Sequence, residues 1–237
     1  AGAIRRMWGN TQEATSVLTA INIFAKEDPD VKLVEVGMCG AGLELNATNL
    51  QSGLLVGASP DGVLSYSNGD IEALEVKNHC PFIFRRFGRG QRPKQQRKFF
   101  VGDRPFDTSD SGTQWILPHY ISQMQMEMLC LGPKCKSAVM IRQSATKGSL
   151  VLRMHRDDEW IKEMLYWLGK FQIDYVEKDV PPPRDFFWDN PRNKEDQSRY
   201  RRFISATQRL NKEKVEVVAH IPSDEIQRAP EAPLFLD

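Results

Sequence analysis

The stretch that decides the fold is GASPDGVLSYSNGDIEALEVK, residues 57–77. Two apolar runs flank Asn68-Gly69, which is the strongest short signal for a β-hairpin because both turn residues tolerate positive φ. We therefore expect paired antiparallel strands over Val63–Tyr66 and Ile71–Lys77. Since side chains alternate along a strand, Glu75 and Lys77 should share one face of the second strand.

Asp61 lies just before the first of these strands, in a turn fixed by Pro60 and Gly62, and can reach the edge that holds Glu75 and Lys77. Two carboxylates and an ammonium would then converge. Clustered carboxylates repel one another, and a divalent cation such as Mg²⁺, which favours oxygen ligands, relieves the repulsion. A lysine beside such an ion can orient or help deprotonate an attacking water. The alternative is an ordinary exposed strand with an ion pair across one face.

Ser59-Pro-Asp-Gly62 followed by Leu74-Glu-Val-Lys77 resembles the PD-(D/E)XK nuclease superfamily, and more narrowly the branch of phage lambda exonuclease and the YqaJ-like viral recombinases. Three further matches stand in family order between Met7 and His155. They are Trp8-Gly9 with Glu13, Cys80-Pro-Phe82, and Tyr120-Ile-Ser-Gln123-Met-Gln125. In this chain Asn78-His79 separate the lysine from the Cys-Pro pair.

The resemblance implies an α/β fold with a restriction-endonuclease-like core, a mixed β-sheet flanked by helices in the order α-β-β-β-α-β. It implies a Mg²⁺- or Mn²⁺-dependent nuclease that hydrolyses DNA phosphodiester bonds as an exonuclease in recombination, repair or DNA turnover. The alternatives are an endonuclease, or a nucleic-acid-binding module whose nuclease site has decayed. A homo-oligomer, a ring-shaped trimer, is implied by the resemblance alone.

The resemblance also assigns roles. Asp61, Glu75 and the Val76 carbonyl would hold the metal, with Glu13 assisting. Lys77 would position or activate the water. Gln123 would orient Lys77 or the scissile phosphate.

The chain departs from the family at two places. The family's acid about ten residues before Asp61 is replaced by Gln51, so Glu13, Glu35 and Glu44 all stay open as the residue that completes the metal site. The family's arginines for a 5′-phosphate lie upstream of this chain apart from Arg5 and Arg6, which leaves the polarity of cleavage open.

Helical spacing of apolar residues predicts a helix over residues 10–25, where Asn10 and Glu13 form a capping box that competes with a metal role for Glu13. A second helix is expected over Pro118–Leu131. At 100° per residue, Gln123 and Gln125 flank its apolar stripe on opposite sides, and Gln123 shares its side with Tyr120 and Glu127.

Further elements complete a domain over residues 1–180, followed by a C-terminal extension over 181–237. We expect strands at 31–36 and 54–57, a hairpin pairing 137–143 with 149–155, a helix over 159–177 capped by Asp157 or Asp158, and a helix over 198–212. Ile161, Leu165, Leu168 and Tyr175 should face inward.

A basic insertion interrupts the domain at about residues 84–115. Phenylalanines are interleaved with eight cations, an arrangement that suits phosphate contacts and base stacking. Seven of the eight are the candidate DNA-binding residues: Arg85, Arg86, Arg89, Arg92, Lys94, Arg97 and Lys98. The alternative is a solvated loop.

Composition narrows the class of protein. The chain has 237 residues with 32 Lys+Arg against 31 Asp+Glu, so DNA binding would have to come from local patches. It lacks an apolar run of about 18 residues, so no membrane partner is expected. Four cysteines without C-x-x-C spacing indicate a reducing intracellular compartment, which the shortened-looking N-terminus leaves unidentified.

Overall fold

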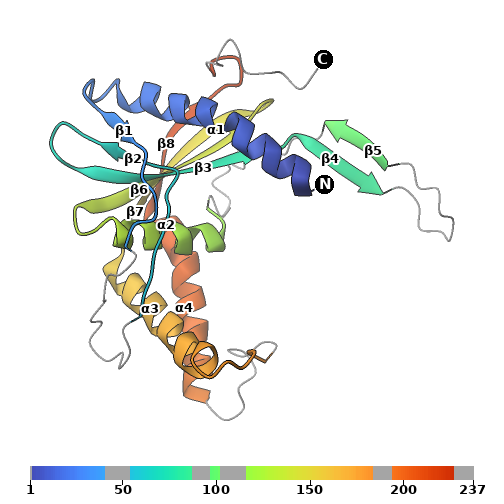
Figure 1. Cartoon of the computed structure of the whole chain (residues 1–237). Coiled ribbons are helices and arrows are strands. Elements are labelled where there is room, and N and C mark those ends of the chain that lie inside the picture. The colour runs from blue at the N-terminus through green and yellow to red at the C-terminus, as the bar shows by residue number, and fades with distance from the viewer. Residues whose placement is uncertain (1, 41–53, 87–96, 102–115, 184–193, 227–237) are drawn as a thin grey trace.

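The computed structural model describes residues 2–40, 54–86, 97–101, 116–183 and 194–226. A six-stranded mixed sheet forms its centre, in the order β1-β2-β3-β6-β7-β8 (Figure 1). Its strands are β1 (Lys32–Val34), β2 (Gly62–Ser65), β3 (Ile71–His79), β6 (Cys135–Ser144), β7 (Gly148–His155) and β8 (Val215–Ile221). β3 and β6 are parallel, and every other neighbouring pair in this sheet is antiparallel.

Helices cover both faces of the sheet. Helix α1 (Gly2–Phe24) lies across one face, and α2 (Pro118–Cys130) lies against the other (Figure 1). Helix α3 (Asp158–Phe171), which continues as a π-helical turn over Gln172–Val176, extends away from the sheet beside α4 (Lys194–Glu213). The expected mixed α/β class, with a mixed sheet flanked by helices, is confirmed.

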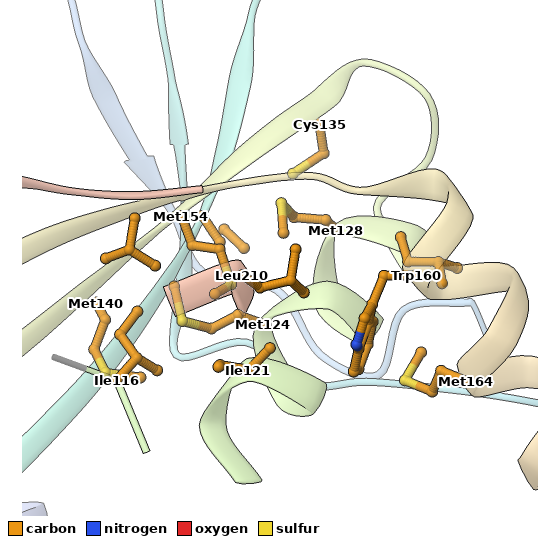
Figure 2. Packing of buried hydrophobic residues seen from close by; sticks show 14 of the residues in the cluster. Ile116, Ile121, Met124, Met128, Cys135, Met140, Met154, Trp160, Met164 and Leu210 are labelled. Atoms are coloured by element: carbon orange, nitrogen blue, oxygen red, sulfur yellow. The ribbon is translucent and has the colours of Figure 1, made fainter. Parts of the chain in front are cut away.

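Two hydrophobic cores follow from the alternation of side chains along the central strands. Leu74 and Val76 face α1, where they pack with Phe24. Ala73 faces the opposite side with α2, where Figure 2 shows several methionines around Ile121 and Leu210: Met124, Met128, Met140 and Met154. Because both faces of the central strands are buried, these strands are apolar on both sides.

The central hairpin has the predicted strands, with Gly62 opposite Leu74 and Ser65 opposite Ile71. The turn differs in one respect, because only Gly69 takes positive φ, at 87°. The Gly69 N–H donates to the Tyr66 carbonyl at 3.0 Å, and the Asn68 side chain accepts from the Asp70 N–H at 2.9 Å. The asparagine therefore stabilises the turn through its side chain rather than through a left-handed backbone.

A buried ion-pair network fixes the register around β3. Glu72 accepts hydrogen bonds from Arg153 on β7, at 2.7 Å from Nε and 3.2 Å from Nη2, and from Tyr66 and Ser137. Burial opposes ionisation of Glu72, but these hydrogen bonds together hold its pKa below the usual range. The network joins β2, β3, β6 and β7 at the end of β3 away from Lys77.

The expected start of the first helix is wrong. Helix α1 begins at Gly2, so Asn10 and Glu13 lie in its interior and no capping box forms. Residues 3–7 are alanine, isoleucine, arginine and methionine, most of which favour helix, and helix propagation continues through Gly9 at a cost of about 1 kcal/mol. Glu13 therefore has no helix-capping role that would compete with a role at the metal site.

Several other expectations are corrected. Residues 54–57 form no strand; Leu54 and Val56 pack into the core, and Ala58 makes an isolated bridge with Cys39. The third helix is α-helical as far as Phe171 and continues as a π-helical turn to Val176, so the expected helix over 159–177 is present with a change of helix type in its last turn. Leu168 is exposed, and Trp167 occupies the buried position instead.

Three strands lie in segments for which no strand was expected. β4 (Phe82–Arg86) and β5 (Arg97–Val101) pair antiparallel within the basic insertion, as a hairpin that projects beyond the sheet (Figure 1). β8, from the segment predicted as a C-terminal extension, pairs with β7 as the last strand of the central sheet. Within the described ranges, no helix is long and apolar enough to cross a membrane.

Candidate active site

Asp61, Glu75 and Lys77 converge at one end of the β2–β3 hairpin. The strand register sets Gly62 opposite Leu74, so Asp61 lies beside the residues of β3 that follow Leu74. Oδ2 of Asp61 accepts a hydrogen bond from the Val76 N–H at 2.7 Å. The Lys77 ammonium forms an ion pair with Oε1 of Glu75, as the shared strand face predicted. The sequence-based placement of these three residues is confirmed.

Burial gives this group an unusual electrostatic environment. The Glu75 side chain is 2% exposed, and its Oε2 has no hydrogen-bond partner in the described part of the chain. Desolvation lowers the pKa of Lys77, although the charges of Asp61, Glu127 and Glu13 oppose the change. A lysine with a lowered pKa is suited to proton transfer as well as to charge stabilisation.

Helix α1 brings Glu13 to the same site. Ser16 donates to the Asn78 side chain at 2.8 Å, and Asn78 donates to the Gly9 carbonyl at 3.3 Å, so the helix is attached to β3 on both sides of Glu13. Burial and then the charges of Asp61 and Glu35 raise the pKa of Glu13, whereas Lys77 lowers it. Glu13 and Glu35 therefore belong to one electrostatic group with the hairpin residues, and Glu44 lies outside the described residues.

Helix α2 presents two polar side chains on one side. Gln123 Nε2 donates to Glu127 Oε1 at 2.9 Å, as expected for residues four apart on a helix. The Tyr120 ring centroid lies 5.0 Å from the Lys77 ammonium, a cation–π distance. This face of α2 therefore meets the catalytic candidates on β3.

Gln125 has a different role, as its opposite position predicted. It donates to the His155 carbonyl at 2.9 Å and accepts from the Asp157 N–H at 3.0 Å, so it fixes α2 to the start of α3.

Glu127 is the residue of this site that sequence reasoning undervalued. It is 1% exposed, and desolvation raises its pKa to about 7, with the Gln123 hydrogen bond opposing and the Asp61 charge reinforcing the rise. Glu127 is four residues after Gln123, and this spacing predicted that both side chains lie on the same side of α2. Nothing in the sequence indicated that this side would be buried against β3.

The donor set is compatible with a hard divalent cation. Among the described residues, no three or more His, Cys, Asp or Glu side chains are close enough to form a metal site by themselves. Mg²⁺, however, is commonly bound by one or two carboxylates and keeps several waters. Asp61, Glu75 and the Val76 carbonyl meet this requirement, and the unpartnered Glu75 oxygen is a free acceptor for such an ion.

Strand β4, which leads into the basic insertion, begins at Phe82, five residues after Lys77. Arg85 lies opposite Lys98 and Arg86 opposite Arg97 on the β4–β5 hairpin. Arg89, Arg92 and Lys94 lie outside the described residues. The hairpin therefore holds four of the seven predicted DNA-binding cations on a two-stranded ribbon next to the site.

A second basic surface lies on α4. A cavity of about 560 Å³ is lined by Gln197, Ser198, Arg201, Arg202, Ser205 and Arg209. Arg199 on the same helix has a structural role instead, because it forms a two-armed ion pair with Glu163 and stacks 3.4 Å above the Tyr166 ring.

Comparison of the chain with protein-family models, with curated proteins and with solved structures finds no match in any of the three.

Proposed function

We propose that this chain is a Mg²⁺- or Mn²⁺-dependent DNA nuclease of the PD-(D/E)XK type, with a restriction-endonuclease-like core, that acts as an exonuclease on phosphodiester bonds. The observation that supports it best is the convergence of Asp61, Glu75 and Lys77, from separate positions on a hairpin, with a buried carboxylate oxygen left unpaired. An ordinary exposed ion pair would not bury Glu75.

The topology also supports this proposal. Apart from β4 and β5, which are inserted between β3 and α2, the elements run α1, β1, β2, β3, α2 and β6, and α2 lies on the connection from β3 to its parallel neighbour β6. This arrangement brings one helix from each face to the end of β3, so that Glu13 on α1 and Glu127 on α2 both act electrostatically on Asp61 and Lys77.

Asp61, Glu75 and the Val76 carbonyl would hold the cation, with Glu13 as an additional acid nearby. The bound cation would supply charge neutralisation at the scissile phosphate and a water of lowered pKa. The negatively charged phosphodiester could not come close to the chain's own acids without such compensation, since like charges repel in a poorly solvated site.

Lys77 would orient the attacking water through its ammonium group; only its deprotonated amine form, which a lowered pKa makes more accessible, could accept the proton of that water. Two features suit the ammonium to this role: its pKa is lowered by burial, and the Tyr120 ring and Glu75 hold it in place. The β4–β5 hairpin would hold the DNA backbone beside the site, because clustered arginines and lysines release condensed counterions when they contact phosphates.

Cleavage of end-labelled linear duplex and closed circular duplex tests the proposal. With Mg²⁺ the wild-type protein should degrade the linear substrate from its ends and leave the circle intact. Asp61→Asn and Glu75→Gln should abolish cleavage while circular dichroism shows an intact fold, and Glu159→Gln, at a side chain 83% exposed on α3, should cleave normally. Full cleavage in excess EDTA, or DNA binding without any cleavage, would refute the proposal; nicking of the circle would replace the exonuclease with an endonuclease.

A further inference from the structure

Glu127 is a buried carboxylate of which only one oxygen accepts a hydrogen bond. It lies on α2 between Met124 and Met128, both fully buried, and is itself 1% exposed. Oε1 accepts from Gln123, while Oε2 has no hydrogen-bond partner among the residues that the structure describes. A polar atom buried without a partner costs free energy, and an apolar residue at this helix position would avoid that cost.

The surroundings of Glu127 contain an excess of negative charge. Asp61 at the start of β2 and Lys77 on β3 both act electrostatically on Glu127. Lys77 is already paired with Glu75, whose own Oε2 is also buried and unpartnered. Three carboxylates, those of Asp61, Glu75 and Glu127, therefore interact electrostatically with or pair with one ammonium, and a bound cation would offset the excess of negative charge.

We propose that Glu127 is a further carboxylate of the divalent-cation site, acting on the cation through its water shell by means of Oε2 while Gln123 fixes Oε1. This inference rests on the proposed metal-dependent function. A role through water is consistent with the spacing of the described acids, which leaves no three of them close enough to share one ion directly. Mg²⁺ retains several of its waters in proteins, and these need acceptors around them.

The same geometry gives Gln123 a definite role. Its amide nitrogen donates to Glu127, so the glutamine acts as a positioning residue for that carboxylate. Residues that hydrogen-bond to the ligands of a metal ion orient those ligands and strongly affect the affinity of the site for the metal.

Titration calorimetry with Mn²⁺ on the full chain tests the inference. Glu127→Gln keeps the shape of the side chain and an acceptor for Gln123 but removes the charge, and it should weaken Mn²⁺ binding roughly 10- to 100-fold. Glu127→Asp, which keeps the charge on a shorter side chain, should bind Mn²⁺ with intermediate affinity. Glu159→Gln is the matched carboxylate control and should bind like the wild type.

A second readout separates a metal role from a structural one. DNA cleavage by Glu127→Gln should recover as the Mn²⁺ concentration rises, whereas a loss that persists at saturating Mn²⁺ would overturn the inference. Mn²⁺ affinity equal to that of the wild type in Glu127→Gln would also overturn it, while leaving the proposed nuclease standing if Asp61→Asn abolishes binding. Absence of Mn²⁺ binding by the wild type would refute both.

Discussion

Replacing Glu127 with glutamine should change the pH dependence of stability of the metal-free protein. Desolvation raises the pKa of this carboxyl from an ordinary 4.5 to about 7 in the folded chain. A carboxyl whose pKa is raised by folding stabilises the fold fully below its unfolded value. That contribution is lost as the pH rises from about 4.5 through about 7.

The magnitude follows from the same two values. Each pH unit between the folded and unfolded pKa corresponds to about 1.4 kcal/mol, so the ionised Glu127 should cost the folded state about 3 kcal/mol at pH 8. Glutamine does not titrate. The free energy of unfolding of Glu127→Gln, compared with that of the wild type, should therefore increase by about 3 kcal/mol between pH 4.5 and pH 8.

Urea denaturation in EDTA, followed by tryptophan fluorescence at half-unit pH steps, measures this difference. Glu13, whose pKa is also raised, titrates in both proteins, so its contribution largely cancels in the comparison. Glu159→Gln should run parallel to the wild type because its carboxylate is exposed. Parallel curves for Glu127→Gln and the wild type would refute the argument, since they would mean that the folded chain leaves this carboxyl with ordinary solvation.

Three further changes test other parts of the molecule. Lys77→Ala should lower turnover by roughly 10²- to 10⁴-fold and leave DNA affinity within a few-fold, as measured by single-turnover kinetics and filter binding; a collapse of affinity with unchanged turnover would make Lys77 a phosphate clamp. Replacing Arg85, Arg86 and Arg89 together by alanine should flatten the log–log salt dependence of duplex binding by about two to three units, and an unchanged slope would indicate a solvated hairpin and direct attention to the α4 surface. Arg153→Met should lower the free energy of unfolding by about 3–5 kcal/mol in urea, because the buried carboxylate that it neutralises is then left uncompensated; a loss below about 1 kcal/mol would show that water replaces the guanidinium.

The local part of this structure was predictable from the sequence. Asn68-Gly69 set the hairpin, and the strict alternation of side chains along a strand then placed Glu75 beside Lys77. The 100° rotation per helical residue likewise separated Gln123 from Gln125, and each now has a different partner. These features depend on neighbours within a few residues, so the sequence contains the information that fixes them.

The start of α1 was mispredicted although the relevant residues are adjacent. Asn10 and Glu13 have the pattern of a helix cap, but a cap forms only where the preceding residues leave the helix. Residues 2–9 remain helical, and the attachment of Gly9 and Ser16 to Asn78 on β3 holds this part of the helix in place. A contact across 62 to 69 positions of sequence cannot be read from the local pattern.

The tertiary structure alone decided which polar groups are buried. Glu127 is a helical glutamate with nothing in its own sequence to distinguish it from the exposed Glu159. Its desolvation results from the packing of α2 on β3, and its charge neighbours come from β2 and β3. Strand β8 depends on long-range pairing in the same way, since a segment with exposed and half-buried positions becomes a strand only where β7 offers an unpaired edge. Burial and edge pairing are properties of the assembled chain, because each needs surfaces that distant segments supply.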